Sequence, residues 1–253
     1  MVSDRMAMVL AALDRAWAPD GTGGGLSLTA CAAASTVLGV DGLYAVVGTR
    51  AGGTVLAFGA QEVGTALEDL QFTLGEGPSP EAAIAGIPVL AGELAAAAAR
   101  WPAFTGPALE LGVNAVFAFP LRIGAIDLGT LTAYRATAGP LNPGQVTDAL
   151  ALADAVTLTV LHSKSAEDAA PGPGSNPAPA PSLDDQPGPG WAAPATYRAE
   201  VHQATGMVSV QLGVSLAEAL ARLRAFAFGR DLLLADVAAD VVARRLRFTD
   251  EDR

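Results

Sequence analysis

The chain has 253 residues, of which 51 % are hydrophobic, 16 % are charged and 6 % are aromatic, and its formal net charge is −11 at pH 7. A chain of this length can bury one or two hydrophobic cores, so length alone leaves the number of domains open. The acidic excess argues against a protein held over its whole surface by nucleic-acid phosphates, because phosphate contacts come mainly from Lys and Arg.

The N-terminal part is predicted to form two helices, then strands, then a closing helix. Ser3 can cap a helix over residues 3–17, and a second helix over residues 27–38 ends at Gly39. The predicted strands cover residues 42–50, 54–58, 87–90, 115–122 and 128–135. Hairpin turns are predicted at 51–53 and 123–127, and Pro143 starts a helix to about residue 162. This order predicts an α+β fold with an antiparallel sheet flanked by helices.

A segment rich in Pro and Gly divides the chain. Residues 164–194 lose the apolar periodicity, and few bulky apolar side chains are available there to offset the entropy of ordering the backbone. We therefore predict a disordered linker at 164–194 between a folded unit at 1–163 and a second folded unit at 195–249.

Three helices are predicted after the linker. The first carries apolar residues at helical spacing and ends at Gly213. The second starts at Ser215, where Glu218 three positions later completes a capping box, and it ends at Gly229. The third is predicted to run to Leu246. Three arginines are expected in its last turn, where the helix dipole favours cations: Arg244, Arg245 and Arg247.

The charge is unevenly distributed between the two ends of the chain. Residues 1–190 hold 7 basic and 18 acidic side chains, a balance of −11, whereas residues 191–253 hold 8 of each. Within residues 191–249 the count is 7 basic against 5 acidic, a balance of +2. The C-terminal unit is therefore the part whose charge permits RNA binding.

Few side chains are available for catalysis or metal binding. Cys31 is the only cysteine, and the two histidines, His162 and His202, lie far apart in the sequence. Neither a multi-cysteine zinc site nor a Ser/His/Asp set is indicated, so we expect no metal, no cofactor and no enzymatic activity. The sequence lacks an apolar run of about 18 residues without polar interruption, and the N-terminus lacks a signal-peptide pattern. We expect a cytoplasmic protein that does not bind membranes.

The N-terminal unit resembles a GAF domain over residues 26–160. The motifs that carry the resemblance are DLQFTLGEGP at 69–78, Trp101-Pro102, Gly112-Val113, FPLR at 119–122 and Leu128-Gly129. The resemblance implies a sheet that encloses a small-molecule ligand and a dimer formed through the terminal helices. Aromatic side chains on the predicted strands are the candidate ligand-pocket residues: Phe58, Phe117, Phe119 and Tyr134. Relatives often have a cysteine where this chain has Ser79, so a thiol-based sensor is not expected there.

The C-terminal unit resembles an ANTAR domain over residues 196–246. The resemblance lies in the combination of VHQATGM at 201–207, LGVS at 212–215 and LADVA at 234–238. ANTAR domains bind paired stem-loops of nascent transcripts and prevent formation of a terminator, and GAF units precede them in actinobacterial regulators. The resemblance therefore implies an RNA-binding transcription antitermination regulator.

Candidate RNA contacts follow from what an RNA loop requires. Splayed bases are recognised by hydrogen-bonding side chains, arginines and close backbone approach. The residues of the C-terminal unit with these properties are Arg198, His202, Gln203, Thr205, Gly206, Arg222 and Arg224. We expect the GAF-like unit to sense a ligand or state and to control association of a homodimer, because a flexible linker transmits effective concentration better than torque.

Two alternatives remain open at the level of sequence. A DNA-binding helix-turn-helix regulator is disfavoured, because residues 241–246 are predicted to continue the third helix instead of turning into a recognition helix. The GAF-like unit could instead be a dimerisation domain without a ligand, with the three helices as a protein-interaction module. An enzyme is not indicated. Reduction of methionine sulfoxide, which some GAF domains catalyse, requires several cysteines, and this chain has only Cys31.

Overall fold

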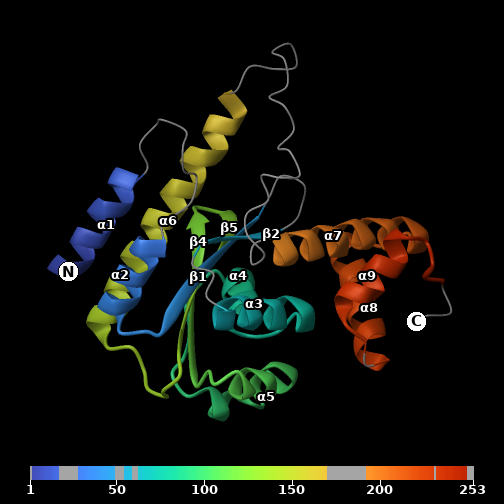
Figure 1. The fold of residues 1–253 in the computed structure, drawn as a ribbon, viewed down its shortest axis with the longest axis horizontal. Helices are drawn as coiled ribbons and strands as arrows, with labels where there is room; N and C mark the ends of the chain where they lie inside the picture. Colours follow the sequence, from blue (N-terminus) through green and yellow to red (C-terminus); the bar gives the residue numbers. More distant parts are fainter. Residues whose placement is uncertain are drawn as a thin grey trace.

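The computed structural model describes the backbone of residues 2–16, 28–48, 54–58, 62–169, 192–230 and 232–249. Side chains are described for residues 2–4, 6–11, 31–47, 62–161, 200–230 and 232–249. Across these ranges the chain forms an N-terminal unit built on a sheet and a C-terminal unit built of helices (Figure 1).

An antiparallel sheet forms the centre of the N-terminal unit. In the described part of the chain it has 5 strands in the order β2-β1-β5-β4-β3. The strands are β1 (Gly42–Gly48), β2 (Thr54–Phe58), β3 (Val89–Ala91), β4 (Ala115–Ile123) and β5 (Ile126–Arg135). The β4–β5 hairpin closes where Ile123 pairs with Ile126, inside the predicted turn. The predicted antiparallel sheet is confirmed, whereas the predicted turn at 51–53 lies outside the described residues.

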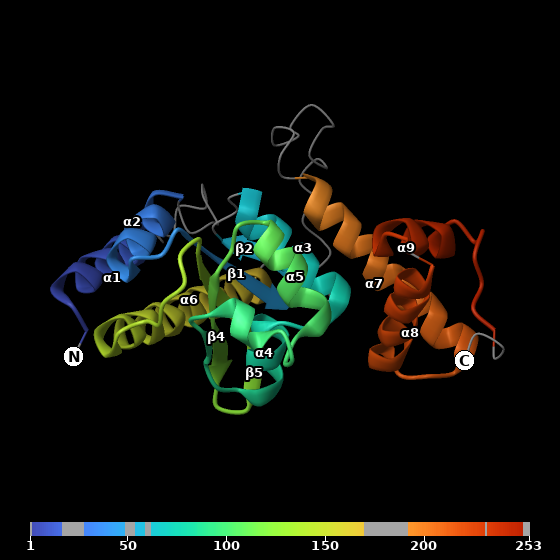
Figure 2. The same cartoon turned by 90° about the horizontal axis from the view of Figure 1, so that it is seen from below.

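Helices cover both faces of the sheet (Figures 1 and 2). One layer contains α1 (Asp4–Ala16), α2 (Leu28–Leu38) and α6 (Pro143–Ala169). The other layer contains α3 (Glu62–Leu74), α4 (Pro78–Ala85), the 3₁₀ helix η1 (Leu94–Ala97) and α5 (Pro102–Glu110). The expected flanking helices are therefore present, but α3 and α5 were not predicted as helices.

The alternation of side chains along the strands builds two separate cores. Phe117 and Phe119 on β4 belong to the core under α1, α2 and α6, whereas their neighbours Val116 and Ala118 belong to the core under α3, α4 and α5. This division follows from the two-residue period of a strand, which sends successive side chains to opposite faces. Each face therefore has its own layer of helices and its own set of buried residues.

The start of α1 is tied to α6. The Ser3 hydroxyl oxygen accepts a hydrogen bond from Met6 N at 3.1 Å, which confirms the predicted cap. The same hydroxyl donates to Asp148 Oδ2 at 2.6 Å, and Ser3 N donates to Asp148 Oδ1 at 2.7 Å. One carboxylate on α6 thus fixes the first turn of α1 against the layer that covers the sheet.

The apolar segment of α6 is a core helix by its contacts. By length and composition Pro143–Leu161 could cross a membrane, but 39 % of that segment is buried inside the unit. Its buried residues share a core with Cys31 of α2. Burial raises the pKa of the Cys31 thiol to about 12, so the thiol is neutral near pH 7 and a poor nucleophile.

Within residues 192–230 and 232–249 the C-terminal unit has three helices: α7 (Ala192–Leu212), α8 (Leu216–Gly229) and α9 (Leu234–Val242). The Ser215 hydroxyl oxygen accepts from Glu218 N at 3.2 Å, as predicted for the cap of α8. Apolar side chains from all three helices form one core, among them Val201, Leu223 and Val237. The unit therefore has a hydrophobic centre of its own.

The predicted end of the third helix is wrong. α9 stops at Val242, and Arg244 adopts a left-handed conformation with φ of 60°. The chain then folds back, so that Phe248 is buried with its ring 5.1 Å from that of Phe226. The arginines at 244, 245 and 247 consequently follow the helix instead of forming its last turn. Residues 243–249 form no further helix.

The predicted linker is too long at both ends. α6 continues through residues 164–169, and α7 begins at Ala192, so both flanks of the segment 164–194 are helical. Residues 164–169 contain no Pro or Gly, and Pro194 lies in the first turn of α7, where proline is tolerated. The rest of the predicted linker, 170–191, lies outside the described residues.

Candidate functional site

Five of the predicted RNA-contact residues lie on α7: Arg198, His202, Gln203, Thr205 and Gly206. Those with described side chains lie on two different faces. Gln203 is exposed, and His202 and Gly206 are partly exposed. Thr205 is buried, and its hydroxyl donates to Val201 O at 2.7 Å. The prediction for Thr205 is therefore wrong, because this residue lies one turn after Val201 and faces the core with it.

The outer face of α7 is open at Gly206. A Cβ built on Gly206 would have no heavy atom within 4 Å, so the packing of this chain does not require glycine there. Gln203 and Val210, at three and four residues from Gly206, lie on the same side of the helix and are exposed, Val210 at 84 %. A glycine in a helix costs up to about 1 kcal/mol relative to alanine, and among the described residues no neighbour offsets this cost.

The predicted arginines differ in what they contact. Arg222 Nη2 lies 2.6 Å from Glu218 Oε1, one turn away on α8, in a partly exposed ion pair. Arg224 points toward the N-terminal unit, where its Nη2 donates to Phe72 O at 2.5 Å. The side chain of Arg198 lies outside the described residues. The described partner of Arg222 therefore lies on the same helix, whereas the described partner of Arg224 lies on α3 of the N-terminal unit.

The predicted ligand-pocket residues with described side chains do not face a common pocket. Phe117 and Phe119 are completely buried in the core under α1, α2 and α6, whereas Tyr134 belongs to the core on the other side of the sheet. Tyr134 pairs with Val116 and Phe117 pairs with Ala133, so the alternation along β4 and β5 separates the two sets. The side chain of Phe58 lies outside the described residues. The prediction that Phe117, Phe119 and Tyr134 line one pocket is wrong.

A buried hydrogen-bonded network lies between the sheet and α3 instead. Gln71 of α3 is 1 % exposed, and its Nε2 donates to Tyr44 Oη at 2.8 Å and to Ser79 Oγ at 2.9 Å. Gln71 Oε1 accepts from Ser79 N at 2.8 Å, and Ser79 Oγ lies 2.6 Å from Thr132 Oγ1. The network joins β1, β5, α3 and α4. Buried amide and hydroxyl groups of this kind are costly to bury without hydrogen bonds, so the network fixes α3 and α4 on the sheet.

The network could have been found in part from the sequence. The buried stripe of α3 consists of Gly64, Leu67, Glu68 and Gln71, which lie at helical spacing. Two of these four are polar, so a search for apolar periodicity does not detect the stripe. Polar residues at the helical positions that otherwise face a core are themselves a sign of a buried hydrogen-bonded network.

Tyr44 makes the stability of the N-terminal unit sensitive to alkaline pH. Burial raises the pKa of its hydroxyl well above the usual value, and the neighbouring Glu68 carboxylate raises it further. An unfolded tyrosine ionises near pH 10, whereas the folded one keeps its proton, so its contribution to stability is present below pH 10 and is lost as the pH rises. We expect the free energy of unfolding to fall above about pH 10, by at most about 1.4 kcal/mol per pH unit from this group.

Urea unfolding between about pH 8 and pH 11 measures this dependence. The Tyr44→Phe variant should be less stable at neutral pH and should show a shallower alkaline decline. The decline should not vanish, because burial also raises the pKa of Tyr134 and of Cys31. An alkaline slope that Tyr44→Phe leaves unchanged would contradict the assignment.

The GEGP segment shapes a turn and caps a helix. Glu76 Oε1 accepts hydrogen bonds from Ala103 N at 2.6 Å and from Phe104 N at 2.8 Å, at the start of α5. A Cβ on Gly77 would lie 2.7 Å from Gln71 Oε1, so this glycine makes room for the buried amide. The motif therefore has a structural role in the described contacts: it connects α3, α4 and α5.

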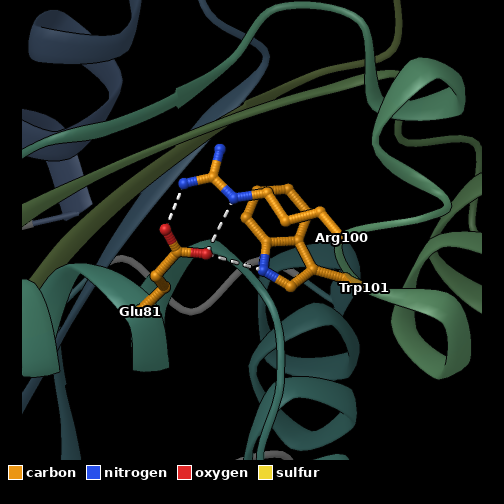
Figure 3. Close-up of polar contacts among 3 residues, drawn as sticks. All are labelled: Glu81, Arg100 and Trp101. Atoms are coloured by element: carbon orange, nitrogen blue, oxygen red, sulfur yellow. Dashed lines mark hydrogen bonds and ion pairs between the residues drawn. The ribbon is translucent and has the colours of Figure 1, made fainter.

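Trp101, another residue of the GAF resemblance, belongs to a polar cluster on the same side of the unit (Figure 3). Its ring is buried, and its Nε1 donates to Glu81 Oε2 at 3.0 Å. Arg100 stacks over the indole at 4.8 Å and forms two hydrogen bonds with the Glu81 carboxylate, as the sticks in Figure 3 show. The hydrogen bond from Arg100 lowers the pKa of Glu81. The cluster links α4 to the segment before α5.

The two units meet where α3 approaches α7 and α8 (Figure 2). Phe72 of α3 packs against the core of the C-terminal unit. An apolar cleft of about 520 Å³ lies beside this contact, between α3, α5 and the start of α9, and includes Leu70, Leu111 and Leu233 in its walls.

No family model matches the sequence, and no curated protein matches it. Among solved structures, the chain is similar to the GAF domain of a phosphoenolpyruvate-protein phosphotransferase from Coxiella burnetii, with 16 % identity over 66 % of this chain and 99 % of that chain and a TM-score of 0.48. The corresponding domain from Acinetobacter has 10 % identity over 64 % and 93 %, with a TM-score of 0.49. The free methionine-R-sulfoxide reductase of Neisseria meningitidis has 18 % identity over 66 % and 96 %, with a TM-score of 0.43. The strand order and the two helical layers define the fold of the N-terminal unit.

Proposed function

We propose that this chain is an RNA-binding transcription antitermination regulator with a GAF-type sensory unit and an ANTAR-type C-terminal unit. The observation that carries the proposal is the outer face of α7. There Gln203 offers an amide beside Gly206, where the absence of a Cβ leaves the backbone accessible and where no neighbour in the chain occupies the space. Close backbone approach beside hydrogen-bonding groups is what recognition of a splayed RNA base requires.

The experiment is binding of the full-length chain to an RNA with two stem-loops and to a DNA duplex of matched length, across a salt series. We expect preference for the RNA and a linear fall of log K with log salt concentration, since Arg222 and other arginines would displace counterions from phosphates. Equal affinity for RNA and DNA at every salt concentration would refute the RNA-binding proposal. Preference for the duplex would favour the alternative of a DNA-binding regulator.

Gly206→Ala should separate RNA binding from stability. The substitution should raise the free energy of unfolding by about 0.5–1 kcal/mol, because alanine is the better helix former and the new methyl group meets no neighbour. It should also weaken RNA binding about tenfold, a loss of about 1.4 kcal/mol, if a base approaches the backbone there. Thermal unfolding and RNA titration of the same preparation measure both effects.

Gly229→Ala is the matched control. Gly229 is also helical and also has open space around its Cβ position, but it lies at the end of α8. The Gly229→Ala substitution should leave RNA affinity unchanged. If Gly206→Ala stabilises the unit without weakening RNA binding, the outer face of α7 is not the RNA contact.

The sensory unit is proposed to act as a homodimer, with α6 in the dimer interface. Leu150 and Leu158 lie two turns apart on this helix and are 42 % and 54 % exposed, although the opposite side of α6 packs on the sheet. In the proposed dimer, these two leucines form part of the apolar surface that the second subunit covers. We also propose that the unit is not an enzyme, which the burial of Cys31 supports.

Leu158→Glu should weaken the dimer at least about tenfold, because a carboxylate would be desolvated at the interface. Sedimentation at several protein concentrations measures the dissociation constant. Ile84→Glu is the control, since Ile84 is 88 % exposed on α4, in the opposite helical layer. A dimer equally affected by both substitutions, or by neither, would place the interface elsewhere.

A further inference from the structure

One residue of the sensory unit contacts two predicted RNA-contact residues at once. The Phe72 ring of α3 lies 5.7 Å from the His202 ring in an edge-to-face arrangement. The Arg224 guanidinium carbon lies 5.6 Å from the centre of the same ring, and Arg224 Nη2 donates to Phe72 O at 2.5 Å. We call this set, together with Gly75, the α3 contact.

The end of α3 suits a guanidinium for three reasons. Phe72 is in the last turn of the helix, where carbonyl groups lack partners within the helix and where the helix dipole is negative. The aromatic ring adds a cation–π interaction. Gly75 leaves room, because a Cβ at this position would lie 2.6 Å from Arg224 Nη1. Arg224 is therefore held by a charge-assisted hydrogen bond and by the ring, at a place where a larger residue would displace it.

The same guanidinium is what an RNA phosphate would bind. A phosphate offers Arg224 a full negative charge and two acceptor oxygens, so it competes directly with the single carbonyl of Phe72. The edge-to-face contact with Phe72 occupies one side of the His202 ring and restricts how that ring can stack on a base. The apolar cleft of about 520 Å³ lies beside the α3 contact, and Leu233 in its wall is 69 % exposed. The units also meet where α7 lies against β2. Opening of the α3 contact removes Phe72 from the side of the C-terminal core, whose buried residues all come from the C-terminal unit itself.

We propose that the α3 contact is an intramolecular restraint: it holds His202 and Arg224 away from RNA, and its release by the sensory unit increases RNA affinity. The inference rests on the proposed RNA-binding function. α3 is suited to this role because its buried face carries Gln71, one residue before Phe72 and the centre of the network on the sheet. A change in how that network is packed would move the end of α3 and with it the carbonyl that holds Arg224.

The test compares the full-length protein with its Phe72→Ala variant by small-angle X-ray scattering and by titration with the two-stem-loop RNA. Phe72→Ala removes the ring from both contacts, so we expect a larger radius of gyration without RNA and about fivefold tighter RNA binding. Gly75→Asn is the second variant, because Asn tolerates the left-handed conformation of Gly75 while its Cβ displaces Arg224. Ile84→Ala, on an exposed position of α4, is the matched control and should change neither measurement.

The outcomes are distinguishable. Opening with tighter RNA binding in both variants supports the restraint. An unchanged radius of gyration in both variants overturns it, and so does opening that leaves RNA affinity unchanged while the parent protein binds RNA. If the variants open but neither they nor the parent protein bind RNA, the RNA-binding function fails and the restraint on RNA binding fails with it, although the contact between the units stands.

Discussion

Replacing Gly129 by alanine is expected to lower the free energy of unfolding of the N-terminal unit by about 4 kcal/mol or more. Gly129 lies in β5 between β1 and β4, where it pairs with Val47 on one side and Leu121 on the other. Its φ is 146°, and a Cβ would lie 1.8 Å from Val46 O and 2.9 Å from Val47 Cα. Both atoms are backbone in a central strand, so relief requires β1 and β5 to separate. Urea unfolding followed by circular dichroism measures the loss.

Gly139→Ala separates the clash from the backbone strain. Gly139 has the same φ of 146°, but a Cβ there would have no heavy atom within 4 Å. The free energy of unfolding of this variant should fall by about 1–3 kcal/mol, which is the conformational cost of placing alanine in a region reserved for glycine. Equal losses in the two variants would show that the sheet accommodates a methyl group at Gly129 and that strain alone accounts for the effect.

Local patterns were sufficient for the strands and for most helix starts. β2 matches its predicted range of 54–58, and the caps at Ser3 and Ser215 form the predicted hydrogen bonds. In each case the signal is a local one: alternation of side chains, or a hydroxyl three residues before an amide. Such signals do not depend on which segments meet in the folded chain.

The wrong predictions concern residues whose surroundings depend on their position along a helix or on contacts with residues distant in the sequence. Thr205 could have been excluded as an RNA contact, because it is one helical turn from the core residue Val201. Phe117 and Phe119 could have been separated from Tyr134 only with the register of β4 against β5. The end of α9 at Val242 was hidden because Arg244, and not a glycine, takes the left-handed conformation. Sequence patterns do not mark such a residue as a helix terminator.

The unpredicted helix α3 is the element on which the functional proposals depend. Its buried face holds Gln71 in the network on the sheet, and Phe72 beside it contacts the C-terminal unit. The sequence drew attention to this segment only through its resemblance to GAF domains. The contact with Arg224 joins residues 152 positions apart in the chain, and local sequence contains no signal for such a pair.

Gln71→Leu is expected to lower the free energy of unfolding of the N-terminal unit by about 2–4 kcal/mol, although leucine preserves most of the side-chain volume. The amide makes described hydrogen bonds with Tyr44, with the Ser79 hydroxyl and with Ser79 N. Removal of its oxygen leaves the buried Ser79 N–H without that acceptor, and the network loses its central donor. A buried polar group deprived of its partner costs more than the hydrogen bond contributed, so the effect exceeds that of lost packing. Urea unfolding of the full-length protein measures it.

Gln203→Ala is the matched control for the loss of an amide. Gln203 is exposed on α7, so its removal should change the free energy of unfolding by no more than about 0.5 kcal/mol while weakening RNA binding. Gln71→Leu should instead lower the free energy of unfolding strongly. It should also disturb the end of α3, because Gln71 is one residue from Phe72. If the restraint is real, this variant also enlarges the radius of gyration before RNA is added. A Gln71→Leu protein as stable as the parent would mean that the network contributes no net stability, and that α3 is held on the sheet by its apolar residues alone.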